Sequence, residues 1–205
     1  MSPSSAVVIL PVKPPAVGKS RLVSIPVARR ELAAAFALDT ASAALAAPRV
    51  AAVLALTDDH LFADELARVG CVVLPDPVDG DLNGSLRQGA AEVRRRWPEA
   101  RPAALCADLP ALLPEDLDAA LAVVLGRPGP SFVADAEGTG TVLYSAAPEE
   151  FAPQFGAGSA EAHAHGGADA VPGELLTLRR DVDDASALVA AARLGLGART
   201  RALLA

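Results

Sequence analysis

The chain has only two lysines, Lys13 and Lys19, and both fall in one short segment after the first hydrophobic run, whereas the other 16 basic residues are arginine. The same segment contains Gly18 and Arg21, and we call it the basic loop (residues 13–21). Compact ammonium groups at a strand-to-loop junction are typical of phosphate binding in α/β proteins. We therefore expect Lys13, Lys19 and Arg21 to bind the phosphates of a polyphosphate ligand.

Two alternative interpretations of the basic loop stay open. The triplet Gly18-Lys19-Ser20 resembles the end of a P-loop, but a P-loop needs glycine five residues before this triplet. That position is Lys13, and two prolines without an N–H follow it. The other alternative is a solvated charged loop that binds no ligand.

A second group of candidate residues is acidic. Asp108 ends the apolar run 103–107 and cannot be fully buried without a partner, so we expect it at the carboxyl edge of a sheet. Much later, Asp181 and Asp183 share one face if the backbone is extended, whereas Asp184 suits the N-cap of a following helix. Carboxylates from two strand ends can hold Mg²⁺ together with nucleotide phosphates.

A third candidate is the glycine-rich stretch 155–159, which leads into Ser159 and a predicted helix. With Ser159 as N-cap, the free N–H groups of such a helix start would attract an anion, although a purely structural cap is an alternative. His163 and His165 lie two residues apart on this helix. They therefore do not share a face, which argues against a two-histidine metal site.

The segments that must position these residues alternate between strand and helix. Strands are expected at 6–12, 50–57, 71–74, 103–107 and 131–134, and helices at 28–47, 59–69, 83–97 and 114–125. This alternation predicts a three-layer α/β/α sandwich with a mostly parallel sheet. After about residue 138, glycine-rich turns surround a short strand, and a final strand and helix are expected within 175–194. We expect one domain over 1–205 with a lid-like insertion at about 136–175.

Composition narrows the function classes. With 205 residues and 52% hydrophobic residues, the chain can fill the core of one large domain. A net charge of −7 argues against a nucleic-acid-binding surface. The first apolar run is too short for a signal peptide or membrane span, so we expect a cytoplasmic protein. Cys71 and Cys106 lie in apolar runs and are expected to be small core residues.

Taken together, the motifs and their order resemble the guanylyltransferases of coenzyme F(420) biosynthesis over nearly the whole chain. These motifs are the basic loop, Asp108-Leu-Pro110, Asp135 with 138–141, 155–159 with His163, and Asp181-Val-Asp183. The resemblance implies a nucleotide-diphospho-sugar transferase-like (glycosyltransferase-A-like) fold. It also implies transfer of GMP from GTP to phosphoenolpyruvate, 2-phospho-L-lactate or 3-phosphoglycerate. The Ala/Arg-rich sequence is most similar to members that use phosphoenolpyruvate.

The resemblance also implies roles for substrate-binding residues. Thr141, Gly156 and Ser159 match the positions that bind the acceptor, which makes 136–175 an acceptor-binding insertion. Asn83 and Ser85 lie where the nucleoside is contacted. A transient hand-over of the product to a downstream transferase is a further implied partnership.

The implied catalytic residues are Lys19, Asp108 and Asp183. Asp108 and Asp183 match the metal-binding carboxylates, Asp181 is a third candidate ligand, and the implied cofactor is Mg²⁺. The cations of the basic loop would handle the GTP phosphates. Asp183 is followed by Asp-Ala-Ser rather than by Thr-Pro and an acidic residue, which leaves the choice between Asp181 and Asp183 open.

Two rival functions remain at this point. One is a nucleotidyltransferase that makes a different activated product, such as a molybdopterin or sugar nucleotide. The other is a nucleotide-binding module without catalysis. The first would be active on its own acceptors and not on phosphoenolpyruvate, and the second would bind GTP without releasing pyrophosphate.

Overall fold

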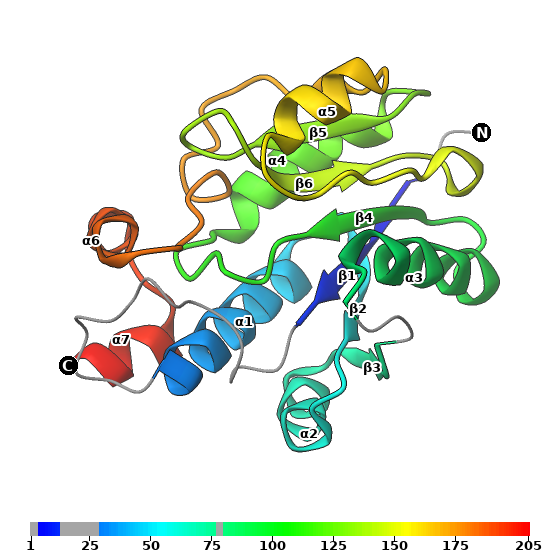
Figure 1. The fold of residues 1–205 in the computed structure, drawn as a ribbon. Coiled ribbons are helices and arrows are strands. Elements are labelled where there is room, and N and C mark those ends of the chain that lie inside the picture. Colours follow the sequence, from blue (N-terminus) through cyan, green and yellow to red (C-terminus); the bar gives the residue numbers. More distant parts are fainter. Residues whose placement is uncertain (1–3, 13–28, 77–79) are drawn as a thin grey trace.

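The computed structural model describes residues 4–12, 29–76 and 80–205 (Figure 1). Within them, seven strands form one sheet in the order β3-β2-β1-β4-β6-β5-β7, with helices on both faces. Strands β1 to β4 pair in parallel, whereas β6 runs antiparallel to both β4 and β5. The predicted three-layer α/β/α sandwich with a mostly parallel sheet is therefore confirmed.

The first part of the chain alternates strands and helices. Its elements are β1 (Ala6–Pro11), α1 (Arg29–Ala46), β2 (Val50–Leu56), α2 (His60–Val69), β3 (Val72–Leu74), α3 (Leu82–Arg96), β4 (Arg101–Leu105) and α4 (Pro114–Leu125). The second part is less regular. Its elements are β5 (Ser131–Ala134), β6 (Thr141–Ser145), the 3-10 turn η1 (Pro148–Glu150), α5 (Ser159–His165), β7 (Asp169–Ala170), α6 (Ala185–Leu194) and α7 (Ala198–Leu204).

The central strand β1 is buried on both faces, which explains its continuous apolar sequence. Val8 and Leu10 pack with α1, α2 and α4, whereas Val7 and Ile9 pack with α3 and α5. Helix α3 lies so close to the sheet that a Cβ at Gly89 would come within 2.9 Å of Ile9. The core therefore consists of two apolar layers separated by the sheet.

The late part of the chain contributes β6 to the sheet, between β4 and β5. The assignment of about 136–175 as a lid-like insertion stays a prediction. The strand expected after residue 175 is wrong, because the described residues 171–205 contain only helices and loops. The reason is side-chain bonding of the backbone: Thr177 N–H donates to Asp116, and Arg179 donates to the carbonyl groups of Ala134, Val171 and Gly173.

Candidate active site

Three carboxylates from two distant segments converge beyond the end of β4. The N–H of Val182 donates to the carbonyl oxygen of Asp108 over 3.0 Å, which joins the segment before α6 to the β4 loop. Oxygen atoms of Asp108, Asp181 and Asp183 then lie within 4.8 Å of one another. Buried Val182 anchors this segment in the core between its two acidic neighbours. The predicted convergence of Asp108 with Asp181 and Asp183 is confirmed.

Thr40, on α1, holds the backbone around Asp108, and the sequence analysis did not identify it. Its side chain is fully buried. Its Oγ1 accepts the N–H of Leu109 over 3.1 Å and donates to the carbonyl of Phe36 over 2.8 Å. The Ala107 carbonyl lies 3.3 Å from the same oxygen. The signal for this role in the sequence was a threonine inside an alanine-rich helix.

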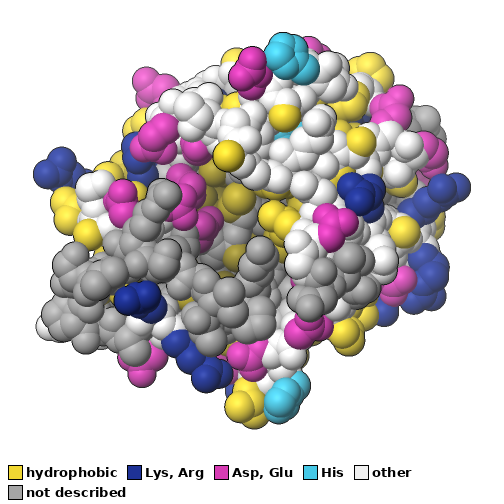
Figure 2. Space-filling model, viewed as in Figure 1, with side chains coloured by type: hydrophobic (Ala, Val, Ile, Leu, Met, Phe, Trp, Pro, Cys, Tyr) yellow, Lys and Arg dark blue, Asp and Glu magenta, His cyan; other side chains and the backbone are white. Residues whose placement is uncertain are grey.

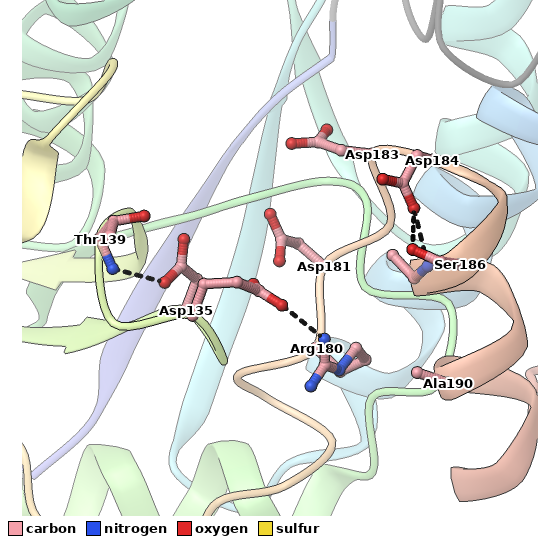
Figure 3. Close-up of a pocket in the computed structure, with 10 residues that line it drawn as sticks. Asp135, Thr139, Arg180, Asp181, Asp183, Asp184, Ser186 and Ala190 are labelled. Atoms are coloured by element: carbon pink, nitrogen blue, oxygen red, sulfur yellow. Dashed lines mark hydrogen bonds and ion pairs between the residues drawn. The ribbon is translucent and has the colours of Figure 1, made fainter.

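Asp184 caps α6, as the sequence predicted. Its carboxylate accepts the N–H of Ala187 over 2.8 Å and the hydroxyl of Ser186 over 2.7 Å. Asp181 and Asp183 precede this cap and turn their carboxylates away from the helix (Figure 3). The helix start therefore fixes the direction in which the acidic segment faces.

Asp181, Asp183 and Asp184 line a cavity of about 530 Å³ (Figure 3). Its other wall is the turn after β5, which contributes Asp135, Glu137 and Thr139. Oxygens of Asp135, Glu137 and Asp181 form a second close group, and Arg180 binds Glu137 over 2.9 Å. Figure 2 shows acidic side chains along a hollow on this face of the molecule. Such a surface favours a cation, or a polyanion that brings cations with it.

Thr141, at the start of β6, lies next to the segment that leads from β4 to Asp108. The N–H of Cys106 donates to the Val142 carbonyl over 2.9 Å, and the thiol of Cys106 donates to the Thr141 carbonyl over 3.4 Å. The side chain of Thr141 is only 5% exposed. The structure therefore places one predicted acceptor-binding residue in contact with Cys106, two positions before Asp108.

Gly156 and Ser159 lie on the loop before α5, where one expectation was wrong. Gly158 is the N-cap in the left-handed conformation (φ 69°), and Ser159 is the first helical residue with a buried side chain. The N–H of Ser159 donates to the Gly156 carbonyl, and that of Ala160 donates to the Thr139 carbonyl. A serine could not adopt the positive φ without strain, so glycine takes the cap position. The exposed backbone of Gly156 (φ 143°) has open space around it.

Asn83 ties α3 to this loop. Its side-chain amide donates to the Phe155 carbonyl over 3.0 Å, and its Oδ1 accepts the Phe155 N–H over 2.8 Å. Ser85 is fully buried, and its hydroxyl contacts the carboxylate of Asp76 and the carbonyl of Asp81. Both residues thus shape the loops around the site, and their contact with a nucleoside stays a prediction.

His163 is a second residue that the sequence analysis left without a role beyond its place in the motif. Its ring is 1% exposed and contacts Thr141 through Nδ1 over 2.9 Å and the Gln154 N–H through Nε2 over 2.8 Å. Burial lowers the pKa of this histidine to about 4, against a smaller opposing effect of the Ser159 backbone. His165 is exposed, so the two histidines face different ways, as expected.

The remaining expectations concern the basic loop and the cysteines. Lys13, Lys19 and Arg21 lie outside the described residues, so their contact with phosphates stays a prediction. Cys71 is buried, as expected, and burial raises its pKa to about 11, whereas Cys106 is half-buried and contacts the Thr141 carbonyl. Among the described helices, none has the length and apolar character needed to cross a membrane.

The fold is similar to solved nucleotide-processing enzymes. A crystal structure from Desulfovibrio desulfuricans G20, described as a nucleotide-diphospho-sugar transferase, matches with TM-score 0.70 at 17% identity over 97% of this chain and 93% of that one. A 4-diphosphocytidyl-2C-methyl-D-erythritol synthase matches with TM-score 0.58 at 12% identity over 93% of this chain and 98% of that one. The fold is thus that of the nucleotide-diphospho-sugar transferases.

No protein-family model matches the chain. Similarity to curated proteins identifies the family of the chain more narrowly than the fold does. Phosphoenolpyruvate guanylyltransferases from Salinispora arenicola and Thermomonospora curvata are each 48% identical over 96% of this chain, covering 92% and 87% of their own lengths. The enzyme of that name from Streptomyces coelicolor is 45% identical over 96% of this chain and 94% of its own length. The chain therefore belongs to the phosphoenolpyruvate guanylyltransferase family.

Proposed function

We propose that this protein transfers GMP from GTP to phosphoenolpyruvate, giving enolpyruvyl-diphospho-5'-guanosine and pyrophosphate in coenzyme F(420) biosynthesis. The observation that carries the proposal is the group of Asp108, Asp181 and Asp183, in a chain 48% identical to proteins named for this activity. These carboxylates would form the metal-binding side of the site, and Thr141, which contacts Cys106 just before Asp108, would form part of the acceptor side.

The described residues fit a divalent metal of the Mg²⁺ type. All three converging side chains are carboxylates, the hard oxygen ligands that Mg²⁺ prefers, and phosphate oxygens would complete its shell. When bound, Mg²⁺ would neutralise charge on the triphosphate. Asp108 and either Asp181 or Asp183 would hold it, and the Val182–Asp108 backbone bond keeps these ligands together.

Charge neutralisation and positioning are the main tasks of this site. A phosphate oxygen of the acceptor attacks the α-phosphorus of GTP, and pyrophosphate leaves. That oxygen is already ionised, so no general base is needed. Each pair of unit charges held at about 4 Å costs about 4 kcal/mol in an effective dielectric near 20. We assign Lys13, Lys19 and Arg21 to the triphosphate, where fixed cations offset this repulsion.

The acceptor side of the proposal consists of Thr141, Gly156 and Ser159. Thr141 supports it through its contact with Cys106, two residues before Asp108, and Gly156 through its exposed, unobstructed backbone. Ser159 has a buried hydroxyl and an N–H bonded to Gly156, so we assign it to shaping the loop around the acceptor. We assign Asn83 and Ser85 to the side of the site that would contact the nucleoside. For the whole protein, we propose a cytoplasmic location and hand-over of the product to a downstream transferase.

A panel of acceptors tests the proposed function. The purified protein is incubated with GTP, Mg²⁺ and either phosphoenolpyruvate, 2-phospho-L-lactate, 3-phosphoglycerate, molybdopterin or a sugar phosphate. Pyrophosphate release and product mass are measured. We expect the largest kcat/KM with phosphoenolpyruvate. Turnover with molybdopterin or a sugar phosphate alone would contradict the proposal, as would GTP binding without pyrophosphate release for any acceptor.

A further inference from the structure

The buried ring of His163 has a defined tautomer. The backbone N–H of Gln154 lies 2.8 Å from Nε2, and a backbone N–H can only donate. Nε2 must therefore carry a lone pair. Burial lowers the pKa of the ring to about 4, so the ring is neutral at pH 7 and its single proton lies on Nδ1.

This tautomer fixes the direction of the contact with Thr141. The Nδ1 of His163 and the Oγ1 of Thr141 are 2.9 Å apart. Since Nδ1 carries the proton, it donates, and the threonine oxygen accepts. The hydroxyl of Thr141 then keeps its own proton for a different acceptor.

The surroundings of His163 prevent the ring from reversing these roles. Tyr144 stacks on it with ring centres 4.6 Å apart, Phe132 lies at 5.8 Å, and Phe155 contacts it edge-on at 5.5 Å. Tyr144 is the titratable side chain among these described neighbours, and burial raises its pKa above the ordinary value. A ring flipped about the Cβ–Cγ bond would place Cε1–H against the Gln154 N–H and Cδ2–H against the Thr141 hydroxyl, so both hydrogen bonds would be lost.

We propose that His163 is a positioning residue that holds the Thr141 hydroxyl as a hydrogen-bond donor toward an anionic oxygen of the acceptor substrate. An anion can only accept hydrogen bonds, so a threonine whose proton pointed into the protein would be useless to it. The same ring joins β6 to the loop that carries Gly156, through Thr141 and Gln154. This inference rests on the proposed function, because it needs the acceptor to lie beside Thr141.

The tautomer is tested first, without substrate, by ¹⁵N NMR of the imidazole rings. The chain has only three histidines, and His60 and His165 are exposed. We expect the ring of His163 to be protonated at Nδ1 and to stay unchanged between pH 8 and pH 5.5. The unchanging signal should vanish in His163→Phe. A His163 ring protonated at Nε2, or one whose protonation changes between pH 8 and pH 5.5, would overturn the inference whatever the substrate is.

The positioning role is tested by a double-mutant cycle with GTP, Mg²⁺ and phosphoenolpyruvate. Thr141→Val removes the hydroxyl, and His163→Phe keeps an aromatic ring but loses both hydrogen bonds. Each should raise the KM for phosphoenolpyruvate roughly ten- to a hundredfold, because a hydrogen bond to a charged group is lost. The double variant should be no worse than either single variant, and the KM for GTP should stay within about twofold in all three.

Two further variants separate positioning from packing. His163→Asn places an amide donor near the position of Nδ1, so it should recover phosphoenolpyruvate affinity relative to His163→Phe, although it loses the ring. His165→Phe, on the exposed side of the same helix, should behave as wild type. His163→Asn performing worse than His163→Phe, or additive effects in the cycle, would overturn the positioning role.

The outcomes also separate this inference from the proposed function. Wild-type protein that forms no product from phosphoenolpyruvate would refute the proposed function. Normal product formation with an unchanged KM for phosphoenolpyruvate in Thr141→Val would leave that function intact and overturn the inference alone.

Discussion

The side chains of Asp108, Asp181 and Asp183 carry like charges and lie close together. A bound metal ion would offset the repulsion between them. We predict that Asp108→Asn or Asp183→Asn abolishes turnover while the melting temperature changes by no more than a few degrees. Kinetics with Mg²⁺ and thermal unfolding check this. Asp184→Asn is the matched control, because asparagine also caps a helix, and it should stay active. Near-normal activity in both ligand variants would remove the carboxylate metal site from the account.

The buried ring of His163 makes the free energy of unfolding depend on pH. Its pKa is about 4 in the folded protein and near 6.5 in an unfolded chain, so the unfolded state binds more protons below pH 6.5. The resulting stability is fully present above pH 6.5 and is lost as pH falls toward 4, by up to about 1.4 kcal/mol per pH unit. Thermal unfolding from pH 7.5 to pH 4.5 should therefore show a smaller loss in His163→Phe than in wild type. Parallel curves would contradict this assignment.

At the scale of elements, α1 supports the β4 loop through Thr40. Thr40→Val keeps the shape of the side chain but leaves the buried N–H of Leu109 without its acceptor, at a cost of about 1–3 kcal/mol. We expect a lower melting temperature and a lower kcat, because the backbone beside Asp108 loses its restraint. Ser42→Ala, two residues further along α1, removes a hydroxyl that donates to the Leu38 carbonyl and accepts from Arg199, away from the β4 loop, and it should leave kcat unchanged. Equal kcat values in the two variants would show that α1 does not position the loop.

Most elements could be predicted from the sequence because their signals are local. Residues 114–125 have proline at the first helical position and apolar residues at helical spacing, and α4 has these bounds. The loop around Leu175 gave a misleading strand signal, because its backbone groups bond to the side chains of Asp116 and Arg179 rather than to a neighbouring strand. Helix α7 was missed because its N-terminus is capped by Asp39, which is 160 residues away in sequence.

The candidate site was predictable to the extent that its residues stand at ends of apolar runs. Asp108 could be placed at the carboxyl edge of the sheet because it follows a strand. No strand of the described chain leads directly into Asp183, and the backbone bond from Val182 to Asp108 brings it to the same place. Thr40 and His163 could not be found in this way, because each acts through contacts with segments distant in sequence. Ser159 was expected to be the N-cap of α5, and this was wrong because a left-handed glycine, Gly158, takes the cap position.

At the scale of the whole molecule, a chain of net charge −7 is proposed to join two polyanions in an acidic crevice. Such a reaction needs mobile or fixed cations to offset repulsion. We predict that chelation with EDTA abolishes pyrophosphate release and that added Mg²⁺ restores it. Turnover that continues after exhaustive chelation would contradict this prediction, because the protein's own cationic side chains would then be enough to offset the repulsion between the substrates.

The central claim is that the acceptor's phosphate group attacks GTP and keeps its oxygen atoms. We would supply phosphoenolpyruvate with ¹⁸O in its phosphate group together with unlabelled GTP, and analyse the products by mass spectrometry. The account predicts a guanylylated product that retains the full ¹⁸O label, formed in equal amount to unlabelled pyrophosphate. Pyrophosphate that carries the label, or GTP consumption without a labelled guanylylated product, would contradict it.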